Sequence, residues 1–291
     1  MRLERFENVG SYLKRVGPFL AAREAEHNLI LGITAGLTTN PEMWPEPPYL
    51  AAVTDRDRVL LATIRTPPYN LVLSEIDDEA FLPPIVPDLA ADLAGANLPG
   101  VLGPDPGVEA FADAWSARTG RQSRRSMGER IFRLERVRPV ARPAGAMRPA
   151  AETDRPLLAA WLTAFAREAV PDEPPPEPDP AIDRYLGGGN QRGLRLWEDG
   201  GRVVSMAGFG GPTPNGARVG PVYTPPELRT RGYATALVAD LSAERLRSGR
   251  RFCFLFTDLA NPTSNRIYQE IGYEPVRDVA VYRFGPSSAP S

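Results

Sequence analysis

Apolar and polar positions follow two alternating periods in the second half of the chain. Asp154–Ala169 begins with a residue that can cap a helix, and its apolar positions then recur on one helical face. The glycines of Asp199–Gly201 predict a hairpin turn between two strands. The later segments are predicted as strand Arg218–Thr224, helix Gly232–Ser248, strand Arg251–Thr257, helix Asn261–Ile271 and strand Val276–Phe284. This order predicts an α/β (α+β layered) fold with a mixed, mostly antiparallel sheet flanked by helices.

The first half repeats this order in a weaker form. Tyr49–Thr54 and Val59–Arg65 predict a hairpin, and Val108–Arg118 predicts a helix that ends at Gly120. The interval from the hairpin turn to the glycine that ends the helix is similar in both halves. We interpret the chain as a degenerate internal duplication, so that the fold is present twice.

Proline clusters suggest where the halves meet. Pro139–Pro149 mixes Pro, Ala and Gly with few apolar residues, and it predicts a linker over residues 139–149. The expected domains are therefore residues 1–138 and 150–285, followed by a tail at 286–291. A second, acidic cluster at Pro171–Pro180 is expected to form an exposed loop.

Composition narrows the classes of function. The chain has 291 residues and a formal net charge of −2, so it lacks the basic surface that nucleic acid requires. No apolar run approaches the roughly 20 residues that span a bilayer, and the N-terminus lacks a signal sequence, so we expect a cytoplasmic protein. Cys253 is the only cysteine, which excludes an internal disulfide and argues against a thiolate metal site. His27 is the only histidine, and a packed or surface role is expected for it.

The first motif with chemical potential is Arg229-x-x-Gly232-x-Ala234, which follows a predicted strand and opens a helix. The first N–H groups of a helix have no internal partner, and the helix dipole adds partial positive charge there. Small residues let a phosphate approach the backbone, while Arg229 and Arg231 add charge. The segment therefore predicts a pyrophosphate site, although a helix start that merely contains Gly and Arg is the alternative. It is neither a Walker loop nor a dinucleotide fingerprint.

The second motif lies on the next predicted helix. Asn261 stands at the expected N-cap with Pro262 after it, and Tyr268 follows two turns later on the same face. Gly272 ends the helix and Tyr273 begins the next strand. For an isolated helix, a capping Asn and a packing Tyr would explain this pattern.

Together, the two motifs and their spacing resemble the GCN5-related N-acetyltransferase (GNAT) superfamily. The resemblance covers residues 147–284, and it implies the acyl-CoA N-acyltransferase fold and acetyl-CoA as co-substrate, with no metal. The first half resembles the fold only. A tandem arrangement with a degenerate N-terminal half is therefore expected.

The resemblance also implies roles for individual residues. Backbone groups of Val222 and Thr224, on either side of Tyr223, would pair with the pantetheine arm and polarise the thioester carbonyl. Asn261 would bind the pantetheine or fix the separation of the strands, and Tyr268 would bind near the sulfur and protonate the leaving thiolate. The pyrophosphate would be held by backbone N–H groups of Arg229, Thr230, Arg231, Gly232, Tyr233, Ala234 and Thr235.

Several points stay open at this stage. No acidic residue lies on the Arg218–Thr224 strand, so the base would be a relayed water or a carboxylate such as Glu198 or Asp258. The stretch between Arg65 and Trp115 lacks the pyrophosphate motif, and Ser116 stands near the position where a Tyr would be needed. We therefore expect no coenzyme A in the first half.

The expected function is N-acetylation of a primary amine by direct attack in a ternary complex. The acceptor would be a small-molecule or peptide amine, with no nucleic acid or membrane partner, and the protein a monomer or homodimer. A non-catalytic acyl-CoA-binding or regulatory protein is the main alternative. Transfer of a longer acyl group is another.

Overall fold

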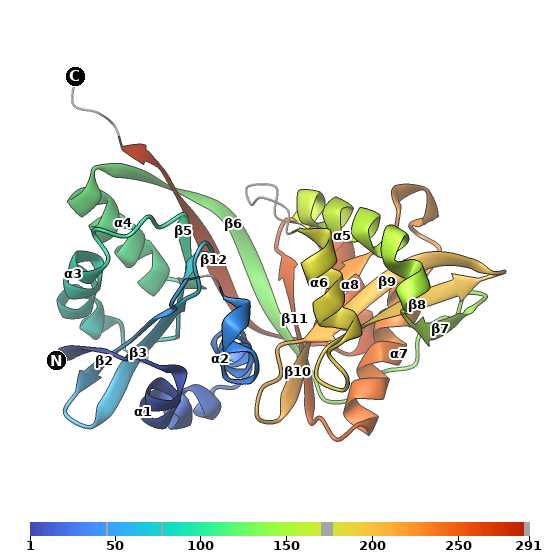
Figure 1. The fold of residues 1–291 in the computed structure, drawn as a ribbon, viewed down its shortest axis with the longest axis horizontal. Helices are drawn as coiled ribbons and strands as arrows, with labels where there is room; N and C mark the ends of the chain where they lie inside the picture. The colour runs from blue at the N-terminus through green and yellow to red at the C-terminus, as the bar shows by residue number, and fades with distance from the viewer. Residues whose placement is uncertain (45, 77, 170–176, 288–291) are drawn as a thin grey trace. The chain divides into compact units, whose positions relative to one another are not determined.

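The computed structural model divides the chain into two compact units (Figure 1). It describes residues 1–291 except 45, 77, 170–176 and 288–291. Unit 1 consists of Met1–Ile131 and Val276–Ser291, and unit 2 of Phe132–Pro275. No helix in the described part of the chain is both long and apolar enough to cross a membrane.

The elements of unit 1 follow one another without long unstructured segments. In chain order they are β1 (Arg2–Arg5), α1 (Val9–Ala22), α2 (Asn28–Thr39), η1 (Pro41–Met43), β2 (Tyr49–Asp55), β3 (Arg58–Arg65), β4 (Leu71–Leu73), η2 (Glu79–Phe81), α3 (Leu82–Asp92), β5 (Gly100–Pro104), α4 (Gly107–Thr119) and β6 (Arg121–Leu134).

The second half of the chain repeats the same succession of strands and α-helices. It contains β7 (Ala146–Pro149), η3 (Glu152–Asp154), α5 (Arg155–Ala169), α6 (Pro178–Leu186), β8 (Gly193–Asp199), β9 (Arg202–Gly210), β10 (Gly216–Tyr223), η4 (Pro226–Leu228), α7 (Tyr233–Arg247), β11 (Phe252–Asp258), α8 (Pro262–Ile271) and β12 (Glu274–Ser287). Each half therefore reads β-α-α-β-β-β-α-β-α-β, as a duplication requires. Most strand pairs are antiparallel, and β4–β5 and β10–β11 are parallel.

The last strand does not belong to the unit that precedes it in sequence. In unit 1 the strand order is β1-β2-β3-β4-β5-β12-β6, and β12 pairs antiparallel with β5 from Val279↔Pro104 to Arg283↔Gly100. In unit 2 the order is β11-β10-β9-β8-β7, and the end of β6 borders β11. The expected division at residues 138 and 285 therefore differs from the compact units, because the pattern of a strand does not specify which strand it pairs with.

Three further segments differ from the sequence expectations. Part of the predicted linker is strand β7, which pairs with β8, and Val137 and Val140 pack against the core of unit 2. Of the predicted loop Pro171–Pro180, residues 171–176 lie outside the described residues, while Pro178 begins α6 because proline fits the first turn of a helix. The predicted tail starts too early, since β12 continues to Ser287.

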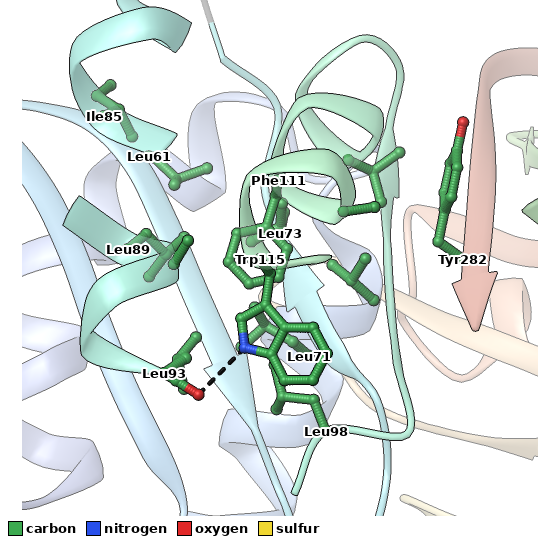
Figure 2. Packing of buried hydrophobic residues seen from close by; sticks show 14 of the residues in the cluster. Leu61, Leu71, Leu73, Ile85, Leu89, Leu93, Leu98, Phe111, Trp115 and Tyr282 are labelled. Atoms are coloured by element: carbon green, nitrogen blue, oxygen red, sulfur yellow. Dashed lines mark hydrogen bonds between the residues drawn. The ribbon is translucent and has the colours of Figure 1, made fainter. Parts of the chain in front are cut away.

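The core of unit 1 shows why β12 belongs there. Trp115 is fully buried and its indole N–H donates to the carbonyl of Leu93 at 3.1 Å (Figure 2). Its ring packs on Phe284 of β12 with 4.2 Å between ring centroids, and Tyr282 of the same strand joins the cluster. An indole buried with its N–H satisfied contributes large apolar area at no polar penalty.

Unit 2 has a separate core on each face of its sheet. One cluster includes Leu237 of α7, Ile271 of α8 and Val219 of β10. The other includes Leu158 and Trp161 of α5, Ile182 of α6 and Tyr223 of β10. Strand β10 therefore presents side chains to both faces.

Phe284→Ala tests the assignment of β12 to unit 1. Removing this buried ring is expected to destabilise unit 1 by about 3–5 kcal/mol, because a cavity opens beside Trp115. Hydrogen exchange should accelerate at the amides of β5 and α4 while β8 and β9 keep their protection. Leu259→Ala, at a side chain 37% exposed, is the control and should change neither. Loss of protection in β8 and β9 instead would show that the strand supports unit 2.

Candidate active site

Strands β10 and β11 separate soon after they begin. Their parallel ladder has three pairs, from Gly216↔Phe252 to Arg218↔Phe254. Strand β10 continues to Tyr223 and β11 to Asp258 beyond the last of these pairs. One edge of β10 therefore has no ladder to β11 over its last five residues.

A bulge in β10 accompanies this separation. The register with β9 passes from Val219↔Phe209 to Val222↔Ala207, so Gly220 and Pro221 stand opposite Gly208 alone. Bulges bend a strand and increase its twist, which moves the end of β10 away from β11. Gly208 permits the close approach, because a Cβ there would lie 2.7 Å from the carbonyl oxygen of Gly220.

The backbone at the end of β10 is oriented by contacts with β9. The carbonyl of Tyr223 accepts a hydrogen bond from Ser205 Oγ at 3.2 Å. In a trans peptide the C=O and the next N–H point in opposite directions, so the N–H of Thr224 points away from β9. The direction of the N–H groups alternates along a strand, so the N–H of Val222, two residues earlier, also points away from β9. The structure thus places the two predicted backbone positions on the open edge.

Helix α7 begins at the end of this edge with an uncapped N-terminus. Gly232 precedes it with φ = 83°, a conformation that favours glycine, and no side chain caps the helix. Its first turn, Tyr233-Ala234-Thr235, contains no acidic residue. The N–H groups of Tyr233, Ala234 and Thr235 therefore have no partner within the helix, whereas the N–H of Arg229 already donates to the carbonyl of Pro226 at 3.3 Å. The side chains of Ala234 and Thr235 are only partly buried.

The side chain of Arg229 does not extend into this cradle. Its Nε donates to the carbonyl of Thr224 at 2.9 Å, and Nη2 donates to both oxygens of Glu168 at 2.7 and 2.9 Å. Glu168 belongs to α5, so we call this three-residue contact the α5 latch. The expectation that Arg229 adds charge to the pyrophosphate site is thus corrected: its charge is paired with a carboxylate, and its geometry fixes the loop. Arg231 has no such partner among the described carboxylates and reaches the carbonyl of Glu227 at 3.3 Å.

The predicted linker also contributes to the surroundings of α7. Arg142 donates to Asp240 at 2.7 Å, and Trp197 donates to the carbonyl of Ala144 at 2.9 Å. Pro143 lies 3.8 Å from where a Cβ on Gly232 would be.

Tyr233 is buried, and its hydroxyl donates to Asp199 at 2.7 Å. Its side chain is therefore engaged in the fold, and the group that Tyr233 can present to a ligand is its backbone N–H.

The start of α8 uses two asparagines. Asn261 caps the helix, accepting from the N–H of Ser264 at 3.0 Å, and its side chain is exposed. Asn265 donates from Nδ2 to the carbonyls of Asp258 and Asn261, at 2.9 and 2.8 Å, and so closes the turn after β11. Its buried Oδ1 has no hydrogen-bond partner among the described residues. Sequence reasoning assigned the strand separation to Asn261 and missed Asn265, which only its four-residue spacing from Asn261 could have suggested.

Tyr268 lies on α8 against the same core cluster as Val222 of β10. Its ring is 5.9 Å from that of Tyr273 and 6.5 Å from that of Phe132, measured between centroids. No hydrogen bond to its hydroxyl is present among the described residues. Burial raises the pKa of Tyr268 to about 12, so the phenol is protonated at neutral pH. Its protonated hydroxyl therefore belongs to a side chain that packs against the same cluster as Val222 of β10.

The two carboxylates proposed as bases are already occupied. Arg148 donates to Glu198 at 2.6 Å and also binds Asp154, which joins β7 to α5. Asp258 accepts from the backbone N–H of Ala260 at 2.8 Å and supports the turn after β11. Both carboxylates therefore make contacts that support the fold, which favours a relayed water among the alternatives for the base.

Comparison with known proteins identifies this half of the chain. Residues 157–273, which contain every predicted site residue, match the acetyltransferase (GNAT) family. This half belongs to the GNAT superfamily. A search of curated proteins found no significant match to the sequence.

Solved structures extend the likeness in fold to the whole chain. A tandem GNAT protein from the clavulanic acid biosynthesis pathway is 14% identical and has a TM-score of 0.59, with both chains fully covered. A Drosophila protein has a TM-score of 0.66 at 13% identity, with 98% of this chain and 99% of that one covered. A GNAT-family putative acetyltransferase from Novosphingobium aromaticivorans DSM 12444 has a TM-score of 0.53 at 20% identity, covering 90% and 98%. The whole chain therefore has the fold of a tandem GNAT protein, and identities this low support the fold alone.

The GNAT-like unit 1 lacks the features that form the cradle of unit 2. By element order α3 corresponds to α7, yet two of its first three residues are Pro83 and Pro84, which have no N–H to donate. Asp78, before the preceding 3₁₀ turn, already accepts from Ala80 at 2.9 Å. A Cβ on Gly103 of β5 would lie 3.0 Å from the Cβ of Leu73, so β4 and β5 stay together.

Two residues considered for other chemistry are structural in this GNAT protein. His27 is buried, its Nε2 accepts from the N–H of Glu75 at 3.2 Å, and its Nδ1 lies 3.1 Å from the carbonyl of Leu20. The packed role is confirmed, and His27 lies between the end of α1 at Ala22 and the start of α2 at Asn28. Burial raises the pKa of the Cys253 thiol to about 12, so it is not a nucleophile. Across the described residues no group of three His, Cys, Asp or Glu forms a metal site.

The α5 latch predicts a change in acetyl-CoA affinity whose direction distinguishes two roles of Arg229. Glu168→Gln is expected to weaken acetyl-CoA binding several-fold, as Arg229→Gln does, because either change frees the loop that precedes α7. If Arg229 instead binds the phosphates directly, losing Glu168 would release a competitor and tighten binding. Isothermal calorimetry measures both, with Arg231→Gln as a matched loss of charge outside the latch. The double variant Arg229→Glu/Glu168→Arg reverses both charges of the ion pair. Tighter acetyl-CoA binding by this double variant than by either of its single substitutions supports the latch.

Proposed function

We propose that unit 2 is an acetyl-CoA-dependent N-acetyltransferase that acts on a primary amine. The observation that carries this proposal is the combination of an open β10 edge with an uncapped helix directly after it. An extended amide-containing arm fits the first, and a pyrophosphate fits the second. Coenzyme A contains both in that order.

The donor would bind as an added strand. The N–H groups of Val222 and Thr224 face the open edge, so they can pair with the pantetheine amides and polarise the thioester carbonyl. Asn265, with its unpaired Oδ1 in the turn after β11, is a further group that could accept from an amide of the arm. The phosphates would then reach the N–H groups of Gly232–Thr235.

The reaction follows from direct attack. The amine nitrogen forms a bond to the thioester carbonyl carbon, the carbon–sulfur bond breaks, and the amine loses one proton. The thiolate takes a proton from Tyr268, which yields free coenzyme A and the N-acetyl product. The phenolate then regains a proton through solvent, so the cycle is balanced with no covalent enzyme intermediate.

Removal of the amine proton would use water, because Glu198 and Asp258 are held in structural contacts. A non-catalytic acyl-CoA-binding or regulatory protein could likewise hold both of these carboxylates in structural contacts. The hydroxyl of Tyr268 makes no hydrogen bond to the described residues, so it can donate to a bound group, and this favours catalysis over binding alone. Transfer of a longer acyl group would use the same edge, and comparing acyl-CoA donors distinguishes it.

Tyr268→Phe tests the proton donor. We expect kcat to fall about a hundredfold while the KM for acetyl-CoA changes less than about twofold, because the phenol acts on the leaving thiolate and not on the bound donor. Release of free thiol with a responsive amine measures both. Tyr69→Phe, at an exposed side chain of unit 1, is the control. Unchanged kcat would remove Tyr268 from this role, and absence of thiol release with bound acetyl-CoA would favour the binding-only alternative.

The differences between the units predict a stoichiometry. Calorimetry should give one acetyl-CoA per chain, because α3 lacks the N–H donors that α7 offers. Gly232→Ala should weaken that single site, since alanine at φ = 83° is strained by roughly 1–2 kcal/mol. Pro83→Ala in unit 1 should leave affinity and stoichiometry as they are. Two molecules per chain would contradict the assignment of unit 1 as a non-binding half.

A further inference from the structure

Two buried hydroxyl groups lie where the ladder between β9 and β10 ends. The last pair of that ladder is Tyr223↔Met206. Thr224 and Ser205 lie one residue further along their strands, opposite each other. Their side-chain oxygens are 2.8 Å apart, and Ser205 is fully buried while Thr224 is 9% exposed. A hydrogen bond between side chains therefore continues the contact between the two strands beyond the ladder.

The directions of the hydrogen bonds at this pair follow from the number of protons. Ser205 Oγ also lies 3.2 Å from the carbonyl oxygen of Tyr223, which can only accept. The single hydroxyl proton of Ser205 is therefore donated to that carbonyl, and the hydroxyl of Thr224 donates to Ser205 Oγ. Both buried protons then have an acceptor. We call this path, from the Thr224 hydroxyl through Ser205 to the Tyr223 carbonyl, the hydroxyl chain.

The hydroxyl chain ends on the peptide group that carries the N–H of Thr224. The carbonyl of Tyr223 and this N–H belong to one planar, conjugated unit. A hydrogen bond accepted by the carbonyl draws electron density from the nitrogen, so the N–H becomes a stronger donor. Hydrogen-bonded groups polarise one another in this way, and the effect is larger in a buried site than in water. The N–H that gains from it is the one that points away from β9, to the open edge of β10.

Neighbouring elements hold this peptide group in place. Ser205 belongs to β9, which lies between β8 and β10, and it pairs with Trp197 of β8. The carbonyl of Thr224, which follows the N–H, accepts from Nε of Arg229 at 2.9 Å. The carbonyls on both sides of the Thr224 N–H thus have fixed partners. Rotation of the peptide group away from the open edge would leave a buried polar group unpaired, which is unfavourable.

We propose that the hydroxyl chain orients and polarises the Thr224 N–H, so that this N–H stabilises the charge on the thioester oxygen during transfer. The proposal rests on the proposed function, in which this N–H faces the thioester carbonyl. As the amine attacks the carbonyl carbon, the π electrons of the C=O bond move to the oxygen, and the N–H donates to it. They return when the carbon–sulfur bond breaks. No proton moves along the chain, and Ser205 acts through a peptide group, so it is a positioning residue.

Removal of each hydroxyl tests the chain through kinetics. Ser205→Ala is expected to lower kcat about tenfold, less than loss of a whole oxyanion donor, while the KM for acetyl-CoA changes less than about threefold because the pyrophosphate contacts remain. Thr224→Val should lower kcat by a smaller factor, and Thr224→Ser, which keeps the hydroxyl, should have the kcat of the wild type. The double variant Ser205→Ala/Thr224→Val should be no slower than Ser205→Ala, because Thr224 acts through Ser205. Independent, multiplying effects would overturn the chain.

An infrared measurement separates polarisation from support of the fold. Acetyl-CoA that is isotope-labelled at the thioester carbonyl should show a lower C=O stretching frequency when bound to the wild type than when free. Ser205→Ala and Thr224→Val should reduce this shift. The matched control is Thr63→Val, because Thr63 is a fully buried strand residue of unit 1 that donates to the carbonyl of Val72 at 2.9 Å. It should change neither the shift nor kcat. An equal shift in the wild type and Ser205→Ala would overturn the proposal, even where kcat falls.

The infrared measurement requires bound donor and no acceptor, so it separates this inference from the proposed function. A wild type that shifts the carbonyl frequency through Ser205 but releases no thiol with any amine would support the hydroxyl chain and refute the acetyltransferase function. A wild type that acetylates an amine without any shift would support that function and refute the chain. A wild type that binds no acetyl-CoA would refute both.

Discussion

The end of the parallel ladder at Arg218↔Phe254 is the constraint on which the site depends. Two residues of β10 stand opposite Gly208 of β9, and the strand turns away from β11 as a result. The backbone that would otherwise continue a ladder is left with N–H groups facing the opening. In a sheet interior such groups would be a defect, since unpaired backbone donors are unfavourable when buried. Here they become useful once a ligand with its own amides takes the place of the missing strand.

Much of unit 2 could be predicted because its signals are local. The turn Asp199–Gly201, the glycine before α7 and the cap at Asn261 each act within a few residues, and the structure has them where they were expected. Contacts over longer separations were not predictable in this way. Arg229 meets Glu168 across 61 residues of sequence. An arginine in this motif suggests phosphate binding. Only the fold shows that the guanidinium of Arg229 is paired with the carboxylate of Glu168 on α5.

The same limit explains the placement of β12. Its alternating pattern predicts a strand, but pairing depends on which sheet edge is free when it arrives. The edge beside β5 offers a core into which Tyr282 and Phe284 fit, against Trp115. A duplicated chain has two equivalent edges, so the terminal strand of one repeat can complete the sheet of the other. Unit 1 therefore requires the end of the chain for its core, although its helix α3 begins with prolines where α7 has N–H donors.

The distribution of arginines then separates structural from functional charge. Arg148, Arg155 and Arg229 each bind carboxylates, so their charges are compensated within the fold. Arg192 differs from these, because its position is set by Gly210 beneath it and the ring of Tyr185 beside it. The formal net charge of −2 for the whole chain agrees with this local balance, because arginines and carboxylates neutralise one another where the fold brings them together.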